Sequence, residues 1–254
     1  MMPQTVQLIK RSQQSQTQQT RNQTQTNQNR AIIFDSGALI SFSMNGITDI
    51  IKKLKEIFKG RFLITSEVKK EIIDVPMKIK RFELEALKLK QLLDERILEF
   101  PSSFGIKDSE VTKKRDEILN IANSTFNSEG KDIHIMDTGE ASCLALGKML
   151  NERKIKNVIV IDERTTRILA EKPENLRRFL EKKLHVKIRT KGNLRFFKDF
   201  KIIRSAELVY VAYKKRLVKL KNGDVLSALL YAVKFKGAAI SGDEIEEIKE
   251  LSRK

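Results

Sequence analysis

The chain has 254 residues, of which 40% are hydrophobic and 33% are charged, and it contains one cysteine. This composition supports one domain with an appendage or two small domains, and it excludes both a disulfide within the chain and a cysteine-based zinc site. No apolar run approaches the roughly 20 residues that span a bilayer, and the N-terminal residues lack the apolar stretch of a secretion signal. We therefore expect a cytoplasmic protein with no membrane partner.

The net charge of +17 favours a polyanionic partner, and nucleic acid is the main candidate. The excess is concentrated in residues 186–221, which hold twelve Lys or Arg against two acids, so we expect this segment to grip RNA. DNA is not excluded, because phosphate contacts do not distinguish the two, and a solvated lysine-rich face is the alternative. Five aromatic residues in this segment are interpreted as packing residues, with base stacking as the alternative: Phe196, Phe197, Phe200, Tyr210 and Tyr213.

Composition divides the chain into three parts. Residues 1–30 are rich in Gln, Thr and Asn, and such a tract buries too little apolar surface to offset its ordering entropy, so we expect a disordered tail. Residues 31–185 alternate strand-like and helix-like patterns, which predicts an α/β domain with a mostly parallel sheet. Residues 186–254 are predicted to form a basic, mainly helical extension.

Short apolar runs define the expected strands, and periodic apolar positions define the helices. Buried strands are expected at 31–34, 62–64 and 157–161, with a weaker one at 97–100. Helices are expected at 36–42, 47–58, 78–96, 109–121, 138–152, 162–170 and 173–184, and in the extension at 206–217, 225–235 and from 243.

Two of the strand patterns end at an acid. Asp35 follows the first strand and Asp162 follows the strand at 157–161, and ligands gather at the carboxyl ends of parallel strands. Carboxylates are costly to hold near a core unless a positive charge pairs with them. Together with the helical acids Glu71 and Glu140, the pattern indicates a shared cation.

Four segments in order resemble the motifs of PIN-domain nuclease family members. Ile33–Ile40 resembles the opening motif, Thr65–Glu71 the second, Asp137–Leu146 the third in its Gly-Glu-Ala variant, and Val158–Arg164 the fourth. The resemblance covers roughly residues 31–185. It implies a flavodoxin-like, three-layer α/β/α fold and a divalent-metal ribonuclease similar to VapC toxins. It also leaves room for an antitoxin-like protein partner and for a homodimer.

The chemistry of phosphodiester hydrolysis asks for the same residue types. Mg²⁺ or Mn²⁺ can activate a water and neutralise the phosphoryl oxygens, and hard cations take carboxylate oxygens. We expect Asp35 and Asp162 to bind the metal directly, with Glu71 and Glu140 completing the cluster directly or through water. The hydroxyls of Ser36, Thr165 or Thr166 would orient a ligand or a water.

Each acid also has a structural interpretation. Asp35 suits a helix cap, Glu71 a surface ion pair, Asp137 with Glu140 a capping box, and Asp162 a cap for the helix beginning at Glu163. Two acids are alternative ligands: Glu67, one helical turn before Glu71, and Asp137, three residues before Glu140.

A second Asp-containing pattern later in the chain imitates the third and fourth motifs. Asp224 opens an apolar helix-like segment, and Asp243 follows the short run 238–240. This pair would be the true second half of the site if the earlier motifs were not.

The leading hypothesis is therefore a metal-dependent endoribonuclease. The alternatives are a non-catalytic nucleic-acid-binding protein whose acids only cap helices, and a structure-specific DNA nuclease of related fold.

Overall fold

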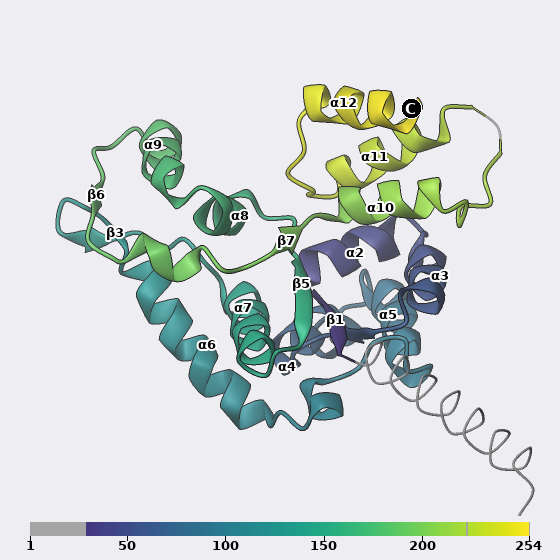
Figure 1. The fold of residues 1–254 in the computed structure, drawn as a ribbon, viewed down its shortest axis with the longest axis horizontal. Helices are drawn as coiled ribbons and strands as arrows, with labels where there is room; N and C mark the ends of the chain where they lie inside the picture. Colours follow the sequence, from purple (N-terminus) through teal and green to yellow (C-terminus); the bar gives the residue numbers. More distant parts are fainter. Residues whose placement is uncertain (1–28, 222, 254) are drawn as a thin grey trace, which may run out of the picture.

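The structure is a computed structural model that describes residues 29–221 and 223–253 (Figure 1). The predicted tail, residues 1–30, lies outside this part apart from its last two residues, and Arg30 already belongs to the first strand. Strands and helices alternate along the described chain, which confirms the α/β class.

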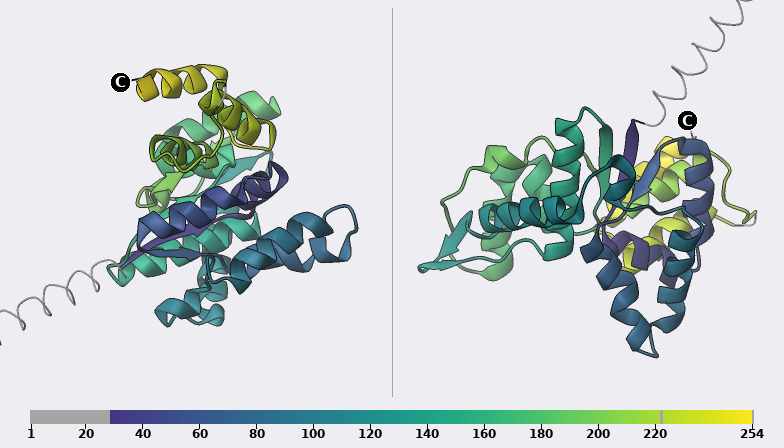
Figure 2. Two further views of the ribbon diagram at one scale, coloured as in Figure 1. Left: turned by 90° about the vertical axis from the view of Figure 1, so that its right-hand side faces the viewer. Right: turned by 90° about the horizontal axis from the view of Figure 1, so that it is seen from below.

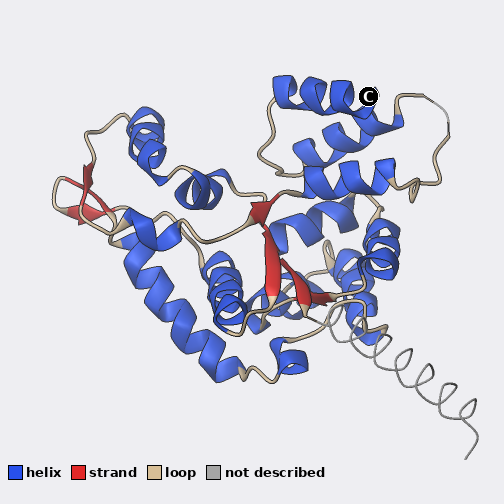
Figure 3. Ribbon diagram, in the orientation of Figure 1, coloured by secondary structure: helices blue, strands red, loops and turns tan. Residues whose placement is uncertain are grey.

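A parallel sheet forms the centre of the fold (Figure 3). Its strands, in the order β2-β1-β5-β7, are Arg61–Leu63, Arg30–Phe34, Lys156–Val160 and Ile202–Ile203. Ile33 pairs with Leu63 on one side and with Ile159 on the other, and all three are fully buried. Such continuous apolar runs are typical of strands covered on both faces. The expected strand at 97–100 is reduced to one bridge between Leu63 and Glu99.

Helices lie around this sheet. They are α2 (Ser36–Met44), α3 (Thr48–Phe58), α4 (Ser66–Lys69), α5 (Glu83–Asp94), α6 (Asp108–Asn123), α7 (Thr138–Glu152), α8 (Arg164–Glu171), α9 (Pro173–Leu184), α10 (Ser205–Lys214), α11 (Val225–Phe235) and α12 (Gly242–Arg253). In Figure 1, α6 and α7 lie on one side of the sheet, and α3 and α5 lie on the other. Helix α7 is buried along most of its length because it packs against α6, β1 and β5.

Shorter elements complete the fold. A π-helical turn, η1 (Lys70–Asp74), continues α4, and the 3₁₀ turns are η2 (Pro76–Lys78), η3 (Pro101–Phe104) and η4 (Leu194–Phe197). A small antiparallel sheet, in the order β4-β3-β6, comprises Lys131–Asp132, Phe126–Ser128 and Arg189–Thr190. In Figure 2, the blue segment around α5 projects from the rest of the molecule.

The segment predicted as an extension, residues 186–254, is continuous with the rest of the fold. It contributes β6 to the small sheet and β7 to the central sheet, and α10 packs against α2 and α3. Its other helices, α11 and α12, are as expected. The apolar residues of this segment belong to the same core as those of the central sheet.

The sheet order creates a topological switch point between β1 and β5. From β1 the chain passes to β2 on one side, and from β5 it passes to β7 on the other. The Asp35 N–H donates to the Val160 carbonyl at 3.0 Å, so the carboxyl ends of the two strands are tied together there. Open parallel sheets bind their ligands at this position, and both Asp35 and Asp162 lie there.

No helix in residues 29–221 or 223–253 has both the length and the apolar character needed to cross a membrane.

Candidate acidic site

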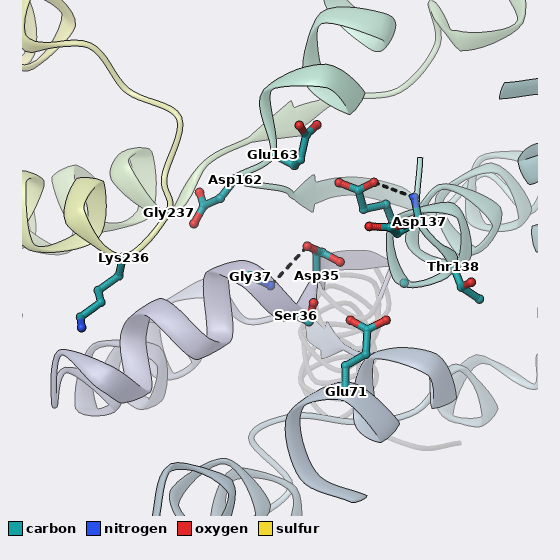
Figure 4. Close-up of a pocket in the computed structure, with 12 residues that line it drawn as sticks. Asp35, Ser36, Gly37, Glu71, Asp137, Thr138, Asp162, Glu163, Lys236 and Gly237 are labelled. Carbon is teal, nitrogen blue, oxygen red and sulfur yellow. Dashed lines mark hydrogen bonds between the residues drawn. The ribbon is translucent and has the colours of Figure 1, made fainter. Parts of the chain in front are cut away.

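An acidic pocket of about 490 Å³ opens at the switch point (Figure 4). Its walls come from the ends of β1 and β5, from η1, from the first turn of α7 and from the segment after α11. The lining residues are Asp35, Ser36, Gly37, Glu71, Asp137, Thr138, Gly139, Glu140, Asp162, Glu163, Lys236 and Gly237. The structure thus brings all four predicted site acids to one pocket.

Asp35 follows β1 directly and is buried, at 5% exposed. Its Oδ2 accepts a hydrogen bond from Gly37 N at 3.3 Å, which caps α2, whereas Oδ1 is buried without a hydrogen-bond partner among the described residues. Burial raises the pKa of Asp35 to about 7, with smaller contributions from the charges of Glu71 and Asp162. A desolvated carboxylate is costly, so a cation in the pocket would stabilise its ionised form.

Glu71 reaches the pocket from the π-helical turn η1, and Figure 4 shows it pointing toward Asp35. Local π turns often occur at functional sites. The first turn of α7 approaches it closely: a Cβ added to Gly139 would lie 2.8 Å from Glu71 Oε1. A glycine at this position therefore leaves the space that the Glu71 carboxylate occupies.

The competing candidate for Glu71 is engaged elsewhere. Glu67 forms an ion pair with Arg115 of α6, and it does not line the pocket. Glu71, rather than Glu67, therefore faces the site.

Glu140 lies in the first turn of α7 and is only 7% exposed. Its Oε2 accepts from Asp137 N at 3.1 Å, so the expected capping contact is present. Burial, and next the charge of Asp35, raise the pKa of Glu140 to about 8. The Asp137 side chain is instead 82% exposed and pairs with His134 at 2.8 Å. Glu140 is therefore the inward acid of the two, and it caps its helix at the same time.

Asp162 ends β5 but has a different set of partners. Its Oδ1 accepts from Ser205 N at 2.8 Å, and Oδ2 is buried without a partner in the described part of the chain. Its pKa is raised by burial, against which the Ser205 N–H lowers it. The alternative interpretation of Asp162, as the cap of the following helix, is wrong: Glu163 caps α8 by accepting from Thr166 N at 2.8 Å. Asp162 caps α10 instead.

The later Asp pattern does not reach the pocket. Asp224 is exposed, accepts from Ser227 N at 3.0 Å as the cap of α11, and pairs with Lys249 at 3.4 Å. Asp243 lies in the first turn of α12, and residues 238–240 form no strand. Neither acid lines the pocket.

Of the three hydroxyl residues predicted to orient a ligand or a water, only one lines the acidic pocket. Ser36 lines the acidic pocket, whereas Thr165 lines a neighbouring pocket of about 230 Å³ that shares Glu140 with it. Thr166 is fully buried and lines neither.

Six lining residues were not named as site candidates. Four of them lie within the four motifs and two lie outside: Gly37, Thr138, Gly139 and Glu163, and then Lys236 and Gly237. Glu163 follows Asp162 directly, and a second acid after a strand end is a signal that could have found it. Lys236 and Gly237 follow α11, slightly more than 200 residues after Asp35, and nothing in the local pattern points to them. Gly237 has φ of +112°, a conformation that favours glycine, so the chain turns sharply at the rim of the pocket.

The basic segment 186–221 holds only two acids of its own, yet three of the six Lys and Arg residues between positions 189 and 204 form ion pairs. Lys191 pairs with Asp132 at 3.5 Å, Lys198 with Glu174 at 2.8 Å, and Arg204 with Glu207 and Glu244. The six residues are Arg189, Lys191, Arg195, Lys198, Lys201 and Arg204, and none of them lines the acidic pocket.

The donor set suits a hard divalent cation, although the side chains do not enclose one. Within residues 29–221 and 223–253, no three His, Cys, Asp or Glu side chains are grouped closely enough to hold a metal ion. Mg²⁺ commonly keeps several waters and is held by one or two protein carboxylates together with substrate phosphates. The unpartnered oxygens of Asp35 and Asp162 fit this loose mode of binding.

Comparison of the chain with protein-family models, with curated proteins and with solved structures gives no match. A functional assignment therefore depends on the fold and the pocket.

Proposed function

We propose that this protein is a divalent-metal-dependent endoribonuclease of PIN-like architecture. The observation that carries the proposal is Asp35: a buried carboxylate at the switch point of a parallel sheet, beside the acids Glu71 and Glu140, with one oxygen unpartnered. A pocket of this kind is unstable as a group of charges alone, because burial and mutual repulsion both oppose ionisation. A bound cation is the simplest reason to keep the acids there.

The residues of the chain would divide the work. Asp35 and Glu71 would hold Mg²⁺ or Mn²⁺, with Asp162 Oδ2 at the other edge, and Glu140 would add negative potential from the first turn of α7. The metal, when bound, supplies neutralisation of the phosphoryl oxygens and a water of lowered pKa. Ser36, at the rim, is placed to donate to a phosphate or a water.

The substrate class follows from charge. The chain carries +17, and a polyanion would be attracted to it although the pocket itself is acidic. The choice of RNA over DNA rests on the resemblance of the four motifs to PIN-domain nucleases.

The test is cleavage of labelled single-stranded RNA and single-stranded DNA by the full chain, with Mg²⁺, with Mn²⁺ and with a chelator. We expect internal cleavage of RNA that requires the metal and disappears with the chelator. Cleavage that persists in the chelator, or that is absent with both metals, would contradict the proposal. Cleavage of DNA alone would indicate the related structure-specific nuclease.

A second candidate is a non-catalytic nucleic-acid-binding protein. It is favoured by the capping contacts of Glu140 and Asp162, which give these two acids a structural role. Metal-independent RNA binding without cleavage would support it.

A further inference from the structure

The end of helix α11 presents an aromatic side chain to solvent beside the acidic pocket. Phe235, the last residue of α11, is 78% exposed, the largest value among the exposed large apolar side chains of the described chain. Scattered apolar residues on a surface are ordinary, but a phenylalanine exposed to this degree is not stabilised by packing. The next two residues, Lys236 and Gly237, line the pocket.

Phe235 is held in place by a second ring. Tyr231 lies one helical turn earlier, and the two ring centroids are 6.0 Å apart with an interplanar angle of 28°, which is a stacked arrangement. Aromatic pairs at this spacing support one another on a helix surface. The Phe235 ring is thus oriented by the protein and still available for a further stacking partner.

Two lysines flank the ring. The ammonium group of Lys234 lies 5.4 Å from the centre of the Tyr231 ring. Lys236 is exposed, and Figure 4 shows its side chain extending away from the acids rather than into the site. Both positions suit the negative end of the helix dipole, but that interaction requires no aromatic residue between them.

We propose that Lys236 and Phe235 form the substrate-gripping element of the site: Phe235 stacks on an unpaired base, and Lys236 binds a phosphate beside the one that is cleaved. The inference rests on the proposed function, and it adds a preference for single-stranded nucleic acid. Base–aromatic stacking with a neighbouring cation is the recurring way in which proteins hold single strands. In a duplex the base faces are already stacked, so the Phe235 ring would find no partner.

The positive charge of the chain favours a nucleic acid over another protein as the partner of Phe235 and Lys236. An acidic pocket repels a polyanion unless cations at its rim offset the repulsion, and Lys236 is the cation that the pocket lining provides in residues 29–221 and 223–253. Three of the five aromatic residues of the basic segment are less suited to stacking, and Tyr213 is 37% exposed against 78% for Phe235. Phe197 and Phe200 are buried, and Phe196 is covered by Lys148, whose ammonium lies 3.7 Å from the ring centre.

The experiment measures binding with the chelator present, so that no cleavage occurs. The probes are short labelled single-stranded RNA, the same RNA as a duplex, and a single strand with abasic sites, each read by fluorescence anisotropy. The variants are Phe235→Ala and Lys236→Gln. The matched controls are Leu251→Ala on α12, 56% exposed, and Lys182→Gln on α9, which lies outside the basic segment 186–221. All four positions are exposed, and circular dichroism checks that each variant is folded.

We expect Phe235→Ala to weaken binding of the single strand by roughly 5- to 100-fold and to leave binding of the abasic strand unchanged. Lys236→Gln should weaken binding of both strands and reduce the slope of log affinity against log salt by about one. Neither control variant should change binding of any probe by more than about twofold, because the proposal places only Phe235 and Lys236 in contact with the strand.

Three results would overturn the inference: no binding of single strands by the wild-type chain, equal binding by Phe235→Ala, or a change of oligomeric state in Phe235→Ala with RNA binding unaltered. The last would make Phe235 part of an interface between copies. The nuclease proposal can fail independently of this inference. In that case the wild-type chain would bind the single strand in a way that depends on Phe235, but it would not cleave RNA in Mg²⁺ or Mn²⁺.

Discussion

The carboxyl ends of β1 and β5 look alike in sequence and differ in the folded protein. Each strand is a buried apolar run followed by an aspartate. Asp35 caps the helix that follows it and faces Glu71, whereas Asp162 caps α10, a helix that begins more than 40 residues later. Asp35 is therefore available to the pocket through its Oδ1, and Asp162 joins the pocket to the C-terminal helices. The same local pattern thus places one aspartate beside Glu71 in the pocket and ties the other to the start of α10.

Replacing the two aspartates by asparagine should show the largest difference. We expect Asp35→Asn to reduce metal-dependent RNA cleavage by about a hundred- to a thousandfold, because it removes the charge that holds the metal. Asp162→Asn should reduce cleavage less, because Asp162 is proposed to approach the metal only from the edge of the pocket, through Oδ2. Initial rates of RNA cleavage measure both, with Asp243→Asn as the control that should retain activity. Equal losses for the two strand-end variants would remove the distinction between them.

The pH dependence of the free energy of unfolding should reflect the raised pKa values of the buried acids near the end of β1. Asp35 changes from its ordinary pKa of 3.8 to about 7, and Glu140 from 4.5 to about 8. For each group, at a pH between its ordinary pKa and its pKa in the folded chain, the folded chain holds a proton that the unfolded chain has lost. The free energy of unfolding should therefore fall as pH rises from about 4 to 8. For Asp35 alone the shift corresponds to ~4 kcal/mol.

Urea unfolding of the metal-free protein across this pH range tests the effect, and Asp35→Asn should flatten the curve between about pH 4 and 7, leaving the slope that Glu140 contributes up to about pH 8. Added Mg²⁺ should restore stability near pH 8, because it binds only the ionised site. A stability that rises through this window would contradict the raised pKa values.

A substitution at Gly139 should disturb the acids near the end of β1 without changing any charged residue. A Cβ there would meet the Glu71 carboxylate at 2.8 Å, so Gly139→Ala should displace that side chain. We expect cleavage to fall by about ten- to a hundredfold through misplacement of one ligand. Gly242→Ala is the matched control, since its nearest neighbour would be the end of Lys234 at 4.0 Å. Unchanged cleavage in Gly139→Ala would mean that Glu71 is not part of the site.

The smallest effect should come from removing the cap at the β5 end. Asp162→Ala leaves the Ser205 N–H without its acceptor, and we expect a loss of about 1 kcal/mol in the free energy of unfolding. Hydrogen exchange should show this loss as faster exchange in the first turn of α10, with little change in α2. Equal protection of α10 in the variant and the wild type would show that Asp162 does not tie the C-terminal helices to the sheet.

The sequence was most informative where the pattern is local. The apolar runs at 31–34, 62–64 and 157–161 correspond to β1, β2 and β5, because a short run covered on both faces is recognisable from its own residues. The acids at two of these strand ends were found for the same reason. The small sheet of β3, β4 and β6 was missed, since its strands have only two or three residues and β6 pairs with β3 from more than 60 residues away.

The choice between neighbouring acids depended on partners from elsewhere in the chain. Glu67 and Glu71 lie on one helical face, and Arg115, on α6, engages the first and leaves the second free. Lys198 likewise appeared unmatched until the fold placed Glu174 beside it. Local spacing contains no information on such contacts.

The sequence by itself determined the α/β class, the strand ends and the set of acids from which the site is built, because these follow from hydrophobic periodicity and residue type. Only the tertiary structure decided which oxygens of Asp35 and Asp162 stay without a partner, which of the two residues caps a distant helix, and that the end of α11 borders the pocket. Burial, desolvation and ion pairing depend on atoms brought together from segments up to 200 residues apart, and so the pKa values and the partners of Asp35 and Asp162 exist only in the folded chain.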